Sequence, residues 1–104
     1  MENKKYVVTL IHFDDDGNYE VQNWTADTRQ CARNIVEQLI REIKNDIDLK
    51  EYAERRKFIF TKWWLDTDNC HLCLGPYGKD DGMDYCLGDY KYDWHFVINE
   101  IVID

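Results

Sequence analysis

The segment from Thr28 to Ile47, TRQCARNIVEQLIREIKNDI, decides the fold class of this 104-residue chain. Apolar residues recur in it at intervals of three and four positions, which is the spacing of an amphipathic helix. They are Cys31, Ala32, Ile35, Val36, Leu39, Ile40, Ile43 and Ile47. The segment therefore predicts one long helix that begins near Thr28, with Thr25 or Asp27 as its cap. Cys31 belongs to the stripe that we expect to be buried.

Strands are predicted on both sides of this helix, because β-branched and aromatic residues dominate there. The expected strands are Tyr6–Phe13, Tyr19–Trp24, Lys57–Leu65 and Asp93–Asp104, with one more short strand between Met83 and Tyr92. Residues 66–82 carry Asn69, Gly75-Pro76, Gly78 and Asp81-Gly82 and are expected to form a loop. Residues 49–56 either continue the long helix or form a second short helix capped by Asp48.

The order β-β-α-β-(β)-β predicts a single α+β domain over residues 1–104, an antiparallel sheet with one long helix packed on one face. A split arrangement, with the helix against two small sheets, is the alternative. No apolar run reaches the length of a membrane span, and the apolar run near the N-terminus is not a signal peptide. We therefore expect a cytoplasmic protein with reduced thiols and no membrane partner.

Four residues near the C-terminus have the composition and spacing of a zinc site. Cys70 and Cys73 form a CxxC pair, Cys86 follows after 12 intervening residues, and His95 follows after 8 more. Thiolate and imidazole are ligands that Zn²⁺ prefers, and four of them close a tetrahedral structural site. The sequence thus predicts a zinc knuckle within residues 66–95, held by these four residues, that staples the C-terminal loop region.

Other interpretations of the CxxC pair remain open. His71, Asp68 or Asp84 could replace His95 as the fourth ligand. A redox motif is less well supported, because the residues that follow Cys73 include Gly75 and Pro76 and cannot begin a helix. The cysteines could also be small buried hydrophobic residues with no metal.

The net charge of −8 is unevenly distributed along the chain. Residues 63–104 hold nine acidic and two basic residues, a net of −7, whereas residues 1–62 hold twelve and eleven, a net of −1. An acidic surface repels nucleic-acid phosphates and attracts basic protein surfaces. We therefore expect binding to a basic protein surface, with no direct nucleic-acid binding, through an acidic segment that carries tyrosines. Its residues are Asp80, Asp81, Asp84, Tyr85, Asp89, Tyr90 and Asp93.

No nucleotide-binding, serine-hydrolase or zinc-protease motif occurs in the sequence, which predicts a protein that is not an enzyme. In its overall profile the chain resembles the small acidic anti-CRISPR proteins encoded by phages. It shares with them a length of about a hundred residues, strong acidity and many aromatic residues. Cys70, Cys73 and Cys86 would make it a zinc-containing member. The resemblance is one of profile over the whole chain and includes no signature motif.

The resemblance implies a stoichiometric inhibitor, active in the cytoplasm of a bacterial host as a monomer or weak dimer. Its partner would be the basic nucleic-acid-binding surface of a type II CRISPR effector nuclease, whose guide or target-DNA loading it would block. Two alternatives follow from the residues themselves. One is a small metal-dependent nuclease that uses His71 or His95 with aspartates at an open metal site. The other is a zinc-stabilised adaptor of an unrelated bacterial complex.

Overall fold

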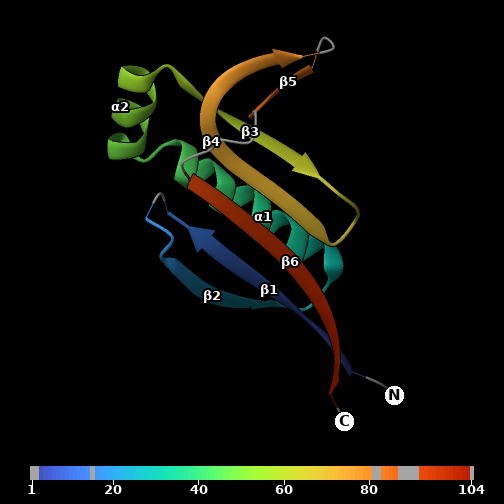
Figure 1. Ribbon diagram of the computed structural model, residues 1–104. Helices are drawn as coiled ribbons and strands as arrows, with labels where there is room; N and C mark the ends of the chain where they lie inside the picture. The colour runs from blue at the N-terminus through green and yellow to red at the C-terminus, as the bar shows by residue number, and fades with distance from the viewer. Residues whose placement is uncertain (1–2, 15, 81–82, 87–91, 104) are drawn as a thin grey trace.

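An antiparallel sheet carries two helices on one of its faces (Figure 1). The computed structural model describes residues 3–14, 16–80, 83–86 and 92–103, and it describes side chains for all of these except 76–80 and 83–86. The strands are β1 (Asn3–Phe13), β2 (Tyr19–Ala26), β3 (Phe58–Trp64), β4 (Asn69–Asp80), β5 (Met83–Cys86) and β6 (Tyr92–Ile103). The helices are α1 (Arg29–Lys44) and α2 (Ile47–Arg56). The sheet order is β2-β1-β6-β4-β3, and β5 pairs with residues 77–80 of β4.

The predicted α+β class and the antiparallel sheet are confirmed, but the single long helix is not. α1 ends at Lys44, with Asn45 as its C-cap. α2 starts after Asp46, whose carboxylate accepts a hydrogen bond from the Leu49 backbone N–H at 3.1 Å. The cap of α1 is Thr28, whose hydroxyl accepts from the Cys31 N–H at 3.0 Å. Short polar side chains thus set both helix starts. Neither helix, in the part of the chain that is described, is long and apolar enough to cross a membrane.

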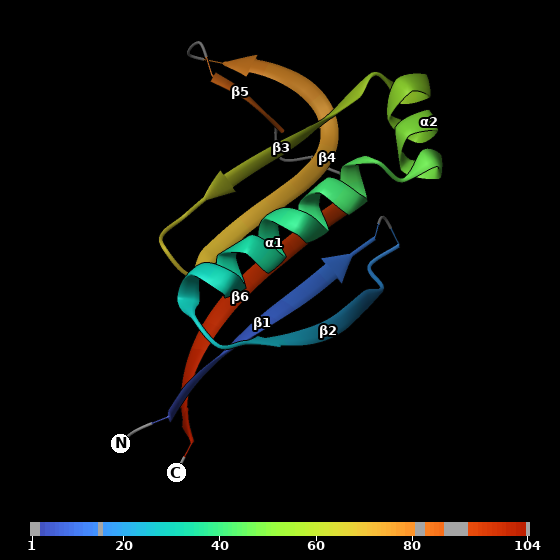
Figure 2. The same ribbon diagram turned by 180° about the vertical axis from the view of Figure 1, so that it is seen from behind.

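The core lies between α1 and the centre of the sheet (Figure 2). Its helical side is a stripe of Ala32, Val36 and Ile40, all buried. The stripe faces buried residues of three adjacent strands, which are Val8 of β1, Phe96 of β6 and Leu72 of β4. The prediction that Cys31 is buried was wrong. It precedes the stripe by one residue, a rotation of about 100° around the helix, and it is exposed.

The loop predicted for residues 66–82 was also wrong, because β4 occupies most of that range. The Gly, Pro and Asn content of the segment obscured a two-residue alternation, in which Cys70, Leu72 and Leu74 all face the core. β4 pairs with β3 along one edge and with β6 along the other, so its first half is central to the sheet. Among the described residues, the pairing with β6 runs from Asn69 opposite Val97 to Leu74 opposite Tyr92.

Polar contacts fix α1 over β3. The Glu37 carboxylate accepts hydrogen bonds from Lys62 Nζ and from Trp64 Nε1, both at 3.0 Å. Partial burial raises the pKa of Glu37, but the hydrogen bonds from Trp64 and Lys62 outweigh it and hold the pKa below its usual value. The Arg33 guanidinium lies 4.2 Å from the centre of the Trp64 ring. This cluster adds directional contacts to the apolar packing of the helix.

β1 and β6 pair along eleven positions, from Asn3 opposite Ile103 to Phe13 opposite Asp93. β2 joins β1 only from Tyr6 onward, and β4 leaves β6 after Val97. The first residues of β1 and the last of β6 therefore project beyond the other strands, with Asn3 and Ile103 side by side (Figure 1).

The core assignment predicts different costs for two isoleucines in helices. Ile40→Ala should lower the free energy of unfolding by about 2–5 kcal/mol, because Ile40 is only 2% exposed and the change leaves a cavity. Ile47→Ala, at a residue 71% exposed, should change it by no more than about 0.5 kcal/mol. Urea unfolding of both variants measures the difference, and equal costs would contradict the packing of α1.

Candidate metal centre

Two histidines and an aspartate gather on the sheet face that points away from α1. His71 comes from β4, and Asp93 and His95 come from β6. In the antiparallel register His71 lies directly opposite His95. Their neighbours Leu72, Trp94 and Phe96 belong to the core, and successive residues of a strand point to opposite faces. The register and the alternation together place the three side chains on one face.

The Asp93 carboxylate lies between the two imidazoles. One of its oxygens contacts His71 Nε2, and the other lies 3.2 Å from His95 Nε2. The two imidazole rings are stacked, with centroids 4.1 Å apart and an angle of 16° between their planes. The Trp63 ring meets the His71 ring edge-on at 4.4 Å. His71 and Asp93 are buried, whereas the His95 side chain is 40% exposed.

The donor set fits a divalent metal ion. The three ligand atoms all lie within 4.8 Å of one another. Ligands bound to zinc at about 2.0–2.1 Å in a tetrahedral site are about 3.3 Å apart, close to the 3.2 Å between Asp93 Oδ2 and His95 Nε2. Two imidazoles and a carboxylate suit Zn²⁺ and other first-row divalent ions. An ion bound here would be joined to both β4 and β6.

The predicted knuckle of Cys70 and Cys73 was wrong. The two residues are three positions apart in a continuous strand, so their side chains point to opposite faces of the sheet. Cys70 packs in the core beneath α1, where burial and then the Glu37 carboxylate raise the pKa of its thiol to about 11. Cys73 is buried on the other face, on which the His71–Asp93–His95 cluster lies. Cys86 lies in β5, and its side chain is outside the described residues.

The histidines of the predicted site are placed together by the fold. His95, expected as the fourth ligand, and His71, expected as an alternative to it, both belong to the cluster. Asp93 was predicted as an exposed partner-binding residue, and this was wrong because it is buried between the two imidazoles. The Asp-x-His spacing in the final strand puts both side chains on one face and could have indicated the pair. Its partner on β4 could not be identified while residues 66–82 were assigned to a loop.

The other predicted partner-binding residues cannot be placed with their side chains. Asp80 lies in β4 and Asp84 and Tyr85 lie in β5, and the side chains of all three are outside the described residues. Asp81, Asp89 and Tyr90 are wholly outside the described residues.

Some of the acidity of residues 63–104 is neutralised by bases from the first half of the chain. Asp68 lies 3.0 Å from the Arg29 guanidinium, and Glu100 lies 3.1 Å from Lys4 Nζ. The contact with Lys4 holds the pKa of Glu100 below its usual value. These two pairs offset part of the acidic excess of residues 63–104 with bases that are distant in the sequence.

Comparison with known proteins gives no relative. The chain matches no protein-family model, and no curated protein or solved structure is significantly similar to it. The residues and their geometry therefore carry the functional argument.

The placement of the cysteines predicts their reactivity with iodoacetamide near pH 8. Cys31 is exposed and should be alkylated readily, whereas buried Cys70, with its pKa of about 11, should react at least about a hundredfold more slowly. Mass spectrometry of tryptic peptides measures both rates. The protection of Cys70 should persist with a metal chelator and vanish in guanidinium chloride. If a chelator removed the protection, Cys70 would be a metal ligand, as the cysteine-knuckle prediction requires.

Proposed function

We propose that the protein is a non-catalytic inhibitor that binds a basic protein surface, and that a Zn²⁺ ion held by His71, Asp93 and His95 keeps its binding segment in place. The observation that carries this proposal is the position of the cluster. It bridges β4 and β6, which are the strands that lead into and out of residues 75–91. Six of the seven residues predicted to bind the partner lie in that segment.

The metal would act as a clamp at the base of this segment. In the described part of the two strands, the pair nearest to this segment joins Leu74 to Tyr92, and His71 pairs with His95 three positions away. A metal bond to both strands resists their separation at this point. A segment whose two ends are fixed loses less conformational entropy when it binds, which favours affinity. The metal would supply no chemistry to the partner.

The charge of the protein indicates the kind of partner. Bound Zn²⁺ would change the net charge from −8 to −6, so the protein would stay acidic. Such a protein is steered towards basic grooves and away from nucleic acid. The resemblance to anti-CRISPR proteins makes the groove of a type II CRISPR effector nuclease the specific target that we propose.

A second candidate is a metal-dependent nuclease or another small hydrolase. The observation that favours it is the number of ligands found among the described residues, because three protein ligands leave a fourth position for water, as in catalytic zinc sites. The exposed part of His95 gives this position a route to solvent. The experiments below separate the two candidates.

The metal assignment predicts one Zn²⁺ per chain. Inductively coupled plasma mass spectrometry of untagged protein should find it, and competition with a chromogenic chelator should give its affinity. Asp93→Asn and His95→Gln should each weaken zinc binding by roughly a hundredfold or more, because each removes a ligand. At a free zinc concentration 100 times Kd, the ion should stabilise the fold by about 2.7 kcal/mol.

His12→Gln is the matched control, because His12 is the one histidine of the chain outside the cluster. It should leave the zinc affinity unchanged. Cys70→Ala should also leave it unchanged, although it changes the core. A stoichiometric metal that is lost with Cys70 and retained in both ligand variants would refute the assignment.

The proposed target predicts inhibition of DNA cleavage by a purified type II CRISPR effector. Inhibition should saturate near one protein per effector, and it should weaken roughly tenfold after zinc is removed or Asp93 is changed to Asn. Replacing Asp81, Asp84 and Asp89 with lysine should reduce inhibition while the zinc content is retained. Exposed Glu51→Lys is the control for charge alone. Turnover of DNA by the zinc-loaded protein without any effector would reject this function and support the nuclease.

A further inference from the structure

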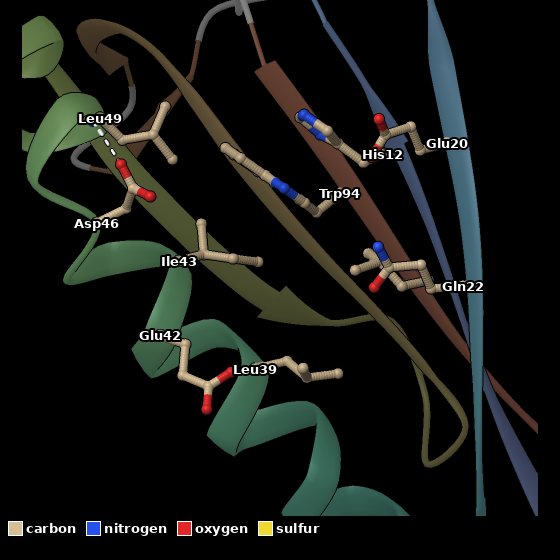
Figure 3. Close-up of a pocket in the computed structure, with 10 residues that line it drawn as sticks. His12, Glu20, Gln22, Leu39, Glu42, Ile43, Asp46, Leu49 and Trp94 are labelled. Carbon is tan, nitrogen blue, oxygen red and sulfur yellow. Dashed lines mark hydrogen bonds between the residues drawn. The ribbon is translucent and has the colours of Figure 1, made fainter.

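A pocket of about 430 Å³ lies on the helical side of the sheet, opposite the metal centre (Figure 3). It is open to solvent on one side and is bordered by the end of α1, the start of α2 and the hairpin of β1 and β2. Leu39 and Ile43 of α1 and Trp94 of β6 give it an apolar interior. Its volume falls within the range of about 300–1,000 Å³ that ligand-binding pockets have.

The polar lining of the pocket is acidic. Glu20 of β2, Glu42 of α1 and Asp46 of the helix junction line it, and no lysine or arginine is among its lining residues. Within the described part of the chain, no cation pairs with any of these three carboxylates. The chain therefore brings carboxylates from three separate elements to one pocket. Asp46 also accepts the Leu49 N–H as the cap of α2, and Glu42 accepts from Gln38 Nε2 at 3.3 Å, and neither of these partners carries a charge.

His12 adds a further acceptor. Its Nδ1 lies 3.2 Å from the backbone carbonyl oxygen of Asp93, which can only accept, so Nδ1 carries the proton. In the neutral imidazole the other ring nitrogen, Nε2, is then an acceptor. The His12 ring stacks on the Trp94 indole, with centroids 4.8 Å apart and planes 8° apart. Together they form a flat aromatic wall.

Trp94 brings a hydrogen-bond donor to the pocket that it lines. It is only 4% exposed, and its indole N–H donates no hydrogen bond to any described residue. Since no buried polar atom of the described side chains lacks a partner, this N–H keeps some contact with solvent. The indole extends from β6 across the pocket towards Leu49 (Figure 3). A ligand that fills the pocket would thus meet one donor in its interior and several acceptors around it.

We propose that this pocket receives an arginine side chain of the partner protein. The guanidinium would pair with Glu20, Glu42 and Asp46, and its stem would lie against Leu39 and Ile43. Arginine is favoured over lysine because its planar head binds carboxylates in pairs and stacks on aromatic rings. This inference rests on the proposed function only in that the partner is a basic protein.

Titration of the isolated protein with Nα-acetyl-arginine methylamide tests the pocket. The probe carries a guanidinium, an apolar stem and carbonyl acceptors. We expect a saturable shift of the Trp94 indole N–H peak in a ¹H–¹⁵N correlation spectrum. The citrulline analogue, which is neutral and nearly the same shape, should bind roughly tenfold more weakly, because it loses its charge-assisted hydrogen bonds. Absence of a saturable shift at Trp94, or equal binding of the two probes, would overturn the proposal.

Substitutions at the carboxylates refine the test. Glu20→Gln and Glu42→Gln should each lower the affinity for the arginine probe roughly fivefold. Both should leave the fold intact, because both residues are exposed. Glu51→Gln is the matched control, since Glu51 is exposed on α2 and does not line the pocket. An equal effect of all three variants would mean that the affinity for the probe depends only on the net charge of the protein, and it would reject a specific site.

Two further measurements distinguish an arginine of the partner protein from a free small cation as the ligand of the pocket. A free diamine such as putrescine that binds more than tenfold tighter than the arginine probe would assign the pocket to a small molecule and reject the partner side chain. In the cleavage assay, Glu20→Gln and Glu42→Gln should weaken inhibition more than Glu51→Gln does. The probe titration uses no effector, so its result is independent of the cleavage assay. The pocket can lack arginine binding while the protein still inhibits the effector, and it can bind arginine while the protein does not inhibit.

Discussion

The packing of the α1 stripe onto the centre of the sheet is the constraint on which the other features depend. Ala32, Val36 and Ile40 meet side chains of β1, β6 and β4. The even-numbered residues of β4 and β6 that fill this core leave the odd-numbered residues on the opposite face. His71, Asp93 and His95 are all odd-numbered, and the register of the two strands brings them together. The candidate metal centre is therefore a geometric consequence of the way the helix packs.

The parts of the fold that could be predicted are those with a strong local pattern. A regular spacing of apolar residues is visible in the sequence of the α1 stripe, of the β1–β2 hairpin and of the final strand. β4 was missed because Gly75, Pro76 and Asn69 gave it the composition of a loop. The metal ligands were misassigned for a related reason. Two of the expected ligands were close in sequence but on opposite faces, whereas the observed cluster needs a strand pairing that no local pattern reveals.

Residues 93 and 94 connect the two candidate sites. The Asp93 carboxylate holds both imidazoles on one face, while its backbone carbonyl accepts from His12 at the edge of the pocket on the other. The next residue, Trp94, turns its indole into that pocket. A shift of β6 at this point would alter both sites at once, since the backbone between them is a single peptide unit. The ion pairs of Arg29 with Asp68 and of Lys4 with Glu100 likewise join residues that are distant in the sequence and meet only in the folded chain.

The pairing of β1 with β6 has a consequence for synthesis on the ribosome. The first strand of the sheet finds one of its two neighbours about a hundred residues later, with Asn3 opposite Ile103. Until β6 has left the exit tunnel, the nascent chain can form the β1–β2 hairpin and α1 but cannot complete the centre of the sheet. One edge of β1 and the apolar stripe of α1 stay uncovered during that time, and contacts this distant in sequence form slowly. These apolar segments consequently stay exposed until β6 has been translated and can pair with β1.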